Sequence, residues 1–147
     1  MKRYISKRDD KCYTNMLKII NTIGGRNLDY NWLITEIETN TGDYFYDQYI
    51  ILSNNELLDK LESNEIQWIW GNFSGIPTKY SKKEILTSKL PGLDNIDKKI
   101  ITIQHPLAEI EIIAYDSTFV QIIAKDENIA KNIKKLYPKS QSTLDEK

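Results

Sequence analysis

The chain has 147 residues, of which 40% are hydrophobic and 28% charged, and its formal net charge is −1. This length and balance fit one globular domain with its own core and argue against two domains or a disordered chain. No apolar run approaches the roughly 20 residues that cross a bilayer. The basic start lacks a following apolar stretch, and Cys12 has no second cysteine to pair with. We therefore expect a cytoplasmic protein without a membrane partner.

The first elements expected along the chain are a strand and an amphipathic helix. Lys2–Ser6 has the length of a short strand, and Asp9 or Asp10 then opens a helix that ends at Gly24-Gly25. The apolar residues of this helix recur at the spacing of one buried face: Cys12, Met16, Ile19, Ile20 and Ile23. Cys12 is therefore expected to be a core residue and not a nucleophile.

A half-buried strand followed by a turn is predicted next. Residues 28–38 alternate, with a core face made of Leu28, Tyr30, Trp32 and Ile34. Residues 40–43 have turn chemistry, so Asp43–Leu52 is expected to return antiparallel. Tyr44, Phe45 and Tyr46 are consecutive in this second arm, and a strand sends neighbouring side chains to opposite faces. At least one of these aromatics then points away from the core, unless the segment is irregular or both of its faces are covered.

Two capping boxes predict the starts of two further helices. Ser53 with Glu56 begins a helix at about Asn54–Ser63, and Ser81 with Glu84 begins a shorter one. Between them, residues 65–72 have strand character, which glycines and Pro77 are expected to interrupt. The run Trp68–Pro77 is either a core strand leaving through a loop or the lining of a ligand pocket.

The C-terminal third predicts a strand at Lys99–Gln104, then a hairpin of Glu109–Tyr115 and Phe119–Ala124, then a helix with Asp126 as its N-cap. Placing the apolar residues on one face requires a three-residue loop, with residue 114 opposite 120, 112 opposite 122 and 110 opposite 124. The other face is half apolar and needs cover from the helix at residue 82 or from a partner. Pro138 ends the last helix, and residues 139–147 are expected to fray.

These elements define the expected architecture. The fold class is α+β: a single domain at residues 1–138 with a mainly antiparallel sheet of about five to seven strands and three to four helices packed on it. A C-terminal hairpin is followed by a terminal helix.

The residues that carry chemistry do not form a catalytic pattern in this sequence. His105 is the single histidine, so the common zinc sets are impossible, and no phosphate loop, nucleophile elbow or dinucleotide fingerprint is present. The carboxylate pairs Glu109 with Glu111 and Asp43 with Asp47 are typical of plain surface. We therefore predict no catalytic, cofactor-binding or metal-binding residue, and a protein that is not an enzyme.

Charge is concentrated in one part of the chain. Residues 29–65 contain nine acidic residues and a single basic one, Lys60, so their partner is expected to be a basic protein. The basic residues near the second capping box lack interleaved aromatics, and nucleic acid is not expected to bind. The predicted partner-binding residues combine these acids with two exposed aromatics: Asp29, Glu36, Glu38, Asp43, Tyr44, Tyr46, Asp47, Glu56, Asp59 and Glu62.

The order of elements, ending in Ala108–Val120 and the terminal helix, resembles small bacterial proteins of uncharacterised function. It also resembles the immunity proteins of contact-dependent inhibition and polymorphic toxin systems. That resemblance implies a cytoplasmic inhibitor that neutralises a toxin, often a basic nuclease, by binding it. Two other interpretations stay open: a small-ligand-binding protein or enzyme with a pocket around Trp68–Pro77, and an oligomer that pairs through Tyr115 and Phe119. The inhibitor itself is expected to be a monomer or a weak dimer.

Overall fold

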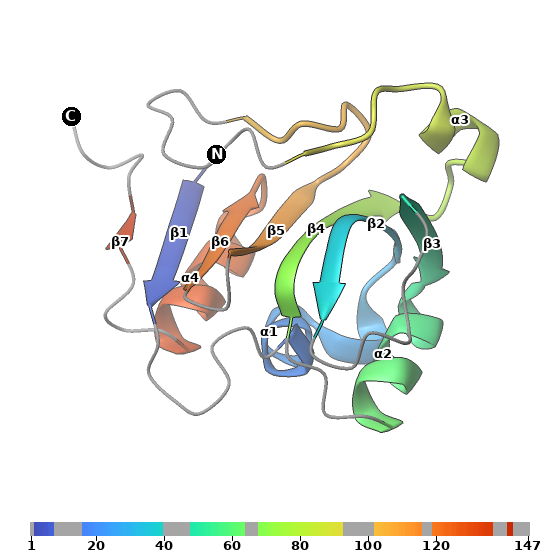
Figure 1. Cartoon of the computed structure of the whole chain (residues 1–147). Helices are drawn as coiled ribbons and strands as arrows, with labels where there is room; N and C mark the ends of the chain where they lie inside the picture. Colours follow the sequence, from blue (N-terminus) through green and yellow to red (C-terminus); the bar gives the residue numbers. More distant parts are fainter. Residues whose placement is uncertain are drawn as a thin grey trace.

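The computed structural model describes residues 2–7, 16–39, 48–63, 68–92, 102–115, 119–136 and 141–142 (Figure 1). Its centre is a seven-stranded sheet in the order β3-β2-β4-β5-β6-β1-β7, in which every pair of neighbours is antiparallel. The strands are β1 Lys2–Lys7, β2 Tyr30–Thr39, β3 Tyr49–Ser53, β4 Trp68–Pro77, β5 Ile110–Tyr115, β6 Phe119–Ala124 and β7 Gln141–Ser142. The α+β class and the antiparallel sheet are confirmed.

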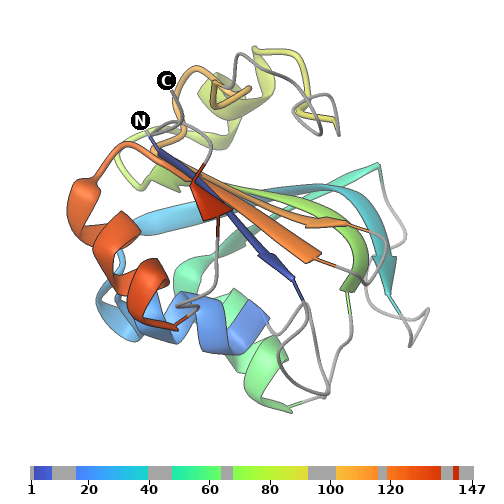
Figure 2. The same ribbon diagram turned by 90° about the vertical axis from the view of Figure 1, so that its left-hand side faces the viewer.

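Helices cover the two faces of this sheet unequally. The helical elements are α1 Met16–Ile23, the 3-10 turn η1 Gly25–Asn27, α2 Asn54–Ser63, α3 Lys82–Leu86 and α4 Glu127–Leu136. Helices α1, α2 and α4 lie together on one face, whereas α3 and the chain that follows it lie on the other (Figure 2). We call these the helix face and the α3 face.

The main core lies between the sheet and the three helices. Met16, Ile19, Ile20 and Ile23 of α1 are buried there, as the predicted stripe requires, and Cys12 lies outside the described residues. Trp32 and Ile34 of β2 are fully buried in the same cluster, and Leu28 and Tyr30 pack against it. The predicted core face of residues 28–34 is therefore confirmed.

Both capping boxes form. The backbone N–H of Glu56 donates to Ser53 Oγ and the Ser53 N–H donates to Glu56 Oε1, each over 3.1 Å, and α2 has the predicted bounds. Ser81 and Glu84 make the same pair of bonds at the start of α3. These reciprocal bonds satisfy backbone donors that a helix N-terminus otherwise leaves free. Asp126 caps the last helix by accepting from the Asn128 N–H over 2.8 Å.

The C-terminal hairpin has the predicted register, with Ile110 opposite Ala124, Ile112 opposite Ile122 and Ala114 opposite Val120. Four side chains on its α3 face are fully buried, a carboxylate and an amide among them: Glu111, Ile113, Gln121 and Ile123. The expectation that Glu111 is plain surface is therefore wrong. Helix α3 contributes to cover on this face, because Ile85 packs there with Leu33, Ile76 and Ala108.

The strands differ from the sequence-based expectations in three places. The prediction of a strand at Lys99–Gln104 is wrong for its described part, because residues 102–104 belong to no strand. Strand β4 is not broken at Gly71 or Gly75, both of which are buried and within the strand, and it continues to Pro77. Gln141–Ser142, in the segment expected to fray, pairs with Tyr4 and Ile5 of β1.

Gly75 is expected to be indispensable to the packing between β4 and β5. A Cβ at this position would lie 2.5 Å from Ile110 Cγ2 and 3.2 Å from Trp32 Cη2. Because both neighbours are fully buried, Gly75→Ala should lower the free energy of unfolding by about 1–3 kcal/mol in urea titrations. The same substitution in an Ile110→Ala background should cost less, and an equal cost in both backgrounds would contradict this explanation.

Candidate functional site

The predicted partner-binding residues separate into three groups along the chain, and Glu36 belongs to the group at β2. Asp43, Tyr44, Tyr46 and Asp47 lie outside the described residues. Asp29 directly precedes β2, and Glu38 lies near the other end of this strand. Nine residues of extended chain place the two acids up to about 30 Å apart. Glu56, Asp59 and Glu62 lie on α2. All six described acids are exposed, but they do not form one continuous surface.

A bulge in β2 shapes the end of the sheet that carries Glu36 and Glu38. The pairing of β2 with β4 shifts register between Thr35 and Glu38, and Glu36 has φ of 54°. It is the sole non-glycine with positive φ among the described residues. A left-handed backbone is unfavourable for a residue with a Cβ, and such strain persists only where the surrounding structure enforces it. The bulge turns Glu36 outward and returns Glu38 to the α3 face of the sheet.

Two half-buried aromatic rings continue the row that Glu38 begins. Glu38 is paired with Trp70 of β4, and the ring of Trp70 meets the ring of Tyr115 of β5 edge to face, with centroids 4.8 Å apart and planes at 70°. Neither ring is fully covered. Edge-to-face pairs fix aromatic side chains in one orientation. We name Glu36, Glu38, Trp70 and Tyr115 the acidic aromatic end of the sheet.

The next row inward explains why this end is rigid. Thr35 Oγ1 donates to the Pro91 carbonyl over 2.7 Å, and the Asn72 amide donates to both the Gly92 carbonyl and Glu111 Oε1 over 2.8 Å. All three side chains are buried. Their bonds fasten the chain at Pro91-Gly92 to β2, β4 and β5, directly behind the acidic aromatic end.

Sequence reasoning identified Glu36 and Glu38 as partner-binding residues but omitted Trp70 and Tyr115. The hairpin register did predict that Tyr115 lies on a half-apolar face, and Trp70 was considered as part of a pocket. What connects them is the pairing of Gly71 with Ala114 across β4 and β5, which places residue 70 beside residue 115. That pairing joins segments more than 40 residues apart and leaves no local pattern.

On α2, Arg26 holds two of the predicted acids. Its Nη2 donates to Asp59 Oδ1 over 2.7 Å and to Glu62 Oε2 over 2.9 Å, while Nη1 donates to the Asn55 carbonyl and side-chain oxygen. The bond to Asp59 is the first cause of a raised Arg26 pKa. Asp59 and Glu62 stay 69% and 50% exposed. Their charge is therefore partly neutralised within the chain, and they are weaker candidates for contact with a basic partner.

Asp29 belongs to a different group of residues at the far end of β2. Its Oδ1 accepts from Thr78 Oγ1 over 2.5 Å, and the neighbouring Tyr30 hydroxyl donates to Glu109 Oε2 over 3.3 Å. Burial, with the nearby Glu109 carboxylate as a second cause, raises the pKa of Tyr30 to about 12. Asp29 therefore has a local structural partner and lies far from the acidic aromatic end.

His105 is a structural residue. It is buried, its Nδ1 accepts from the Leu107 N–H over 3.1 Å, and its Nε2 lies 2.8 Å from the Ile85 carbonyl. These bonds require a proton on Nε2 and use both ring nitrogens. Within the described ranges no group of three His, Cys, Asp or Glu side chains is placed to hold a metal ion.

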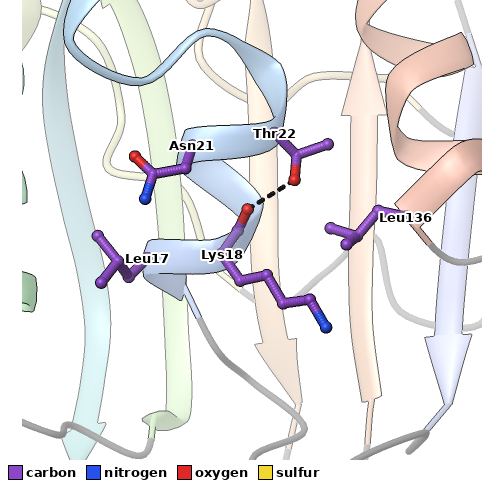
Figure 3. A pocket seen from close by; sticks show the side chains of 5 residues that line it. All are labelled: Leu17, Lys18, Asn21, Thr22 and Leu136. Atoms are coloured by element: carbon purple, nitrogen blue, oxygen red, sulfur yellow. Dashed lines mark hydrogen bonds between the residues drawn. The ribbon is translucent and has the colours of Figure 1, made fainter.

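The described surface includes two open hollows beside helices. One, of about 510 Å³, lies between α1 and α4 and is lined by Leu17, Lys18, Asn21, Thr22 and Leu136 (Figure 3). The Thr22 hydroxyl there donates to the Lys18 carbonyl of its own helix over 2.8 Å. The other, of about 500 Å³, lies between β3 and α3 and is lined by Gln48, Tyr49, Ile50, Ile51, Lys82 and Leu86. Neither is lined by a residue of the Trp68–Pro77 run.

Comparison with protein-family models, with curated proteins and with solved structures yields no match. None of the helices in the described ranges is long and apolar enough to cross a membrane.

The raised Tyr30 pKa predicts a pH dependence of stability. Because the folded chain favours the neutral phenol, this contribution is complete below the ordinary value of 10 and is lost as the pH rises through about 12. Tyr30→Phe should therefore lose less stability than the natural chain between pH 10 and 12 in urea titrations. Glu109→Gln should lower the pKa of the Tyr30 phenol. This pKa is measured from tyrosinate absorbance, as the difference between chains with and without the Tyr30→Phe substitution. Equal alkaline losses in the natural and Tyr30→Phe chains would contradict this prediction.

The backbone strain at Glu36 makes a second prediction. Glu36→Gly should raise the free energy of unfolding by about 1 kcal/mol, because glycine adopts positive φ without a Cβ clash and this gain exceeds its extra unfolded-chain entropy. Glu36→Gln is the matched control, since it removes the charge and retains the Cβ. Stabilisation by Glu36→Gln equal to that by Glu36→Gly would show that charge, and not backbone conformation, is responsible.

Proposed function

We propose that this chain is a non-enzymatic cytoplasmic binding protein that recognises a basic surface of another protein through the acidic aromatic end of its sheet. Its biological role in this proposal is that of a bacterial immunity protein, and its partner is a nuclease-type toxin domain. The observation that carries the proposal is the half-exposed pair of Trp70 and Tyr115 beside the exposed carboxylates of Glu36 and Glu38.

This combination suits a protein interface that binds cations. Tryptophan and tyrosine bury a large area on binding and lose little side-chain entropy, and they dominate the binding energy of many interfaces. A lysine or arginine of the partner can lie against the Trp70 ring and pair with the Glu38 carboxylate, so that one cation satisfies two groups. Nuclease domains carry such cations because they bind phosphate.

Rigidity supports the same interpretation. The edge-to-face contact and the buried bonds of Thr35 and Asn72 fix the surface before any partner arrives. A preorganised surface loses less conformational entropy on association, which raises affinity. Glu36 stays in its strained conformation although a glycine there would relieve the strain, as is common where a side chain serves binding.

The acids on α2 have a supporting part in this proposal. Asp59 and Glu62 are already bonded to Arg26, and Glu56 is bonded to Ser53, which lowers the Glu56 pKa. Their exposed charge adds to the negative field that attracts a basic partner and raises the association rate. Asp43, Tyr44, Tyr46 and Asp47 lie outside the described residues and stay predicted partner-binding residues.

The alternative of a ligand pocket around Trp68–Pro77 receives less support. Residues 71–76 are buried in a central strand, between β2 and β5, as the alternative of a core strand requires. We therefore retain the binding protein as the proposal.

The test begins with the neighbouring reading frame. A large secreted protein encoded directly upstream is expected to carry a toxic C-terminal domain, and co-expression of this chain should protect cells from that domain. In binding titrations with the purified domain, Trp70→Ala should weaken affinity by about 30-fold or more, as expected for an aromatic anchor. Asp29→Asn is the matched control at the other end of β2 and should leave affinity unchanged.

The salt dependence of the association rate distinguishes long-range electrostatic attraction of the partner from direct contact in the complex. The double variant Glu36→Gln with Glu38→Gln should lower the association rate at low salt, and this difference should shrink as salt is raised. If co-expression protects cells and the toxin domain binds the Trp70→Ala variant as tightly as the natural chain, the acidic aromatic end is not part of the interface. A locus without a toxic secreted protein beside it would contradict the immunity role.

A further inference from the structure

One carboxylate and one aromatic ring are cross-strand neighbours at the acidic aromatic end. Ile37 packs against the main core on the helix face, so Glu38, the next residue of the extended strand, points to the α3 face. Trp70 is paired with Glu38 across β4 and β2 and shares the α3 face with Asn72, two residues further along β4. Directly opposed residues on one face have Cβ atoms about 4.5–5.5 Å apart. A group that binds at this position therefore meets both side chains.

The contact between Trp70 and Tyr115 leaves room for a ligand beside Glu38. The two rings meet edge to face, with planes at 70°, so Tyr115 occupies at most one face of the Trp70 ring. Tyr115 belongs to β5 and Glu38 to β2, and these strands flank β4 on opposite sides. Tyr115 therefore approaches Trp70 from the side away from Glu38. A ligand that pairs with Glu38 can contact the half-buried Trp70 without displacing Tyr115.

The carboxylates of this end differ from the other exposed acids in having no partner among the described residues. Glu36 and Glu38 accept no hydrogen bond or ion pair there. Glu127 lies in the first turn of α4, where the helix dipole favours a negative charge. The remaining exposed acids of the described ranges each accept a hydrogen bond from another residue: Asp29, Glu56, Asp59, Glu62, Glu84, Glu109 and Asp126. Glu38 can thus bind a cation without breaking a bond that the fold uses.

We propose that the acidic aromatic end binds an arginine side chain of its partner, with the guanidinium stacked on Trp70 and paired with Glu38 through two N–H groups. The face of a guanidinium stacks on an aromatic ring while the N–H groups at its edge donate to a carboxylate, so both contacts form together. A lysine ammonium is a strongly hydrated point charge and loses more water against a half-buried ring. This inference rests on the proposed function, because it names the residue that the proposed surface recognises.

Two tripeptides test the preference without a toxin domain. The isotope-labelled full chain is titrated with acetyl-Gly-Arg-Gly-amide or acetyl-Gly-Lys-Gly-amide at constant ionic strength. The NMR signal of the Trp70 indole N–H, assigned by its loss in Trp70→Leu, reports binding. We expect the arginine peptide to bind with a Kd of about 10–50 mM and the lysine peptide about threefold or more weakly. Equal affinities, or no saturable shift with the arginine peptide, would overturn the proposal.

A pair of substitutions tests the role of the carboxylate. Glu38→Gln retains the size of the side chain and removes its charge, so the two tripeptides should then bind within about twofold of each other. Glu127→Gln is the matched control, because it removes an exposed acid on α4 and should leave both affinities unchanged. Both positions are exposed, and the dispersion of the amide signals verifies that both variants fold. An arginine preference that survives Glu38→Gln would refute the paired geometry.

The arginine site and the proposed function can fail separately. If the toxin domain binds through Trp70, but replacing each of its interface arginines by lysine leaves the affinity unchanged, the arginine inference is refuted and the proposed function stands. If the arginine tripeptide binds at Trp70 with the expected preference, but no toxic secreted protein is encoded beside this chain, the immunity role is contradicted and the arginine site stands.

Discussion

The structure depends on the burial of one carboxylate in the α3 face of the sheet. Glu111 is fully buried, and its Oε1 accepts from the Asn72 and Gln104 amides, each over 2.8 Å. A buried carboxylate is tolerated only when hydrogen bonds replace its water. Gln104 also exchanges two bonds with the backbone of Gly92, so the chain segments at residues 92 and 104 are fixed to the sheet at one point. These bonds, together with the apolar cluster of Leu33, Ile76, Ile85 and Ala108, hold the second layer on the sheet.

That requirement also determines what the acidic aromatic end can be. Asn72 lies opposite Thr35 in β2, and the β-bulge begins immediately beyond that pair. The strand is held regular up to Thr35 by buried bonds, and its change of direction is therefore confined to the next two residues. Glu36 absorbs the change in a left-handed conformation, and Glu38 arrives beside Trp70. The positions of Glu36 and Glu38 at this end of the sheet therefore depend on the buried polar side chains of Thr35 and Asn72 behind them.

Local signals in the sequence predicted local structure accurately. Each capping box involves residues three apart, and the hairpin register follows from alternation over 15 residues, so both could be derived without knowing the rest of the fold. Contacts between distant segments could not. Arg26 is 33 and 36 residues from Asp59 and Glu62, and no spacing rule connects them. For the same reason the acids of residues 29–65 were expected to share one surface, whereas β2 places Asp29 and Glu38 at opposite ends.

The unequal cover of the two faces explains where recognition features can occur. In the described ranges, three helices of eight to ten residues cover the helix face, whereas one helix of five residues, followed by residues 87–92, lies on the α3 face. Five residues of helix span about 7.5 Å, which is less than the width of two strand pairs. The polar network extends the cover over Asn72 and Glu111, and it ends one row before Trp70 and Tyr115. Among the described residues, the cover of the α3 face stops short of the aromatic pair, which remains half-exposed, and β3 is an edge strand beside the same short helix.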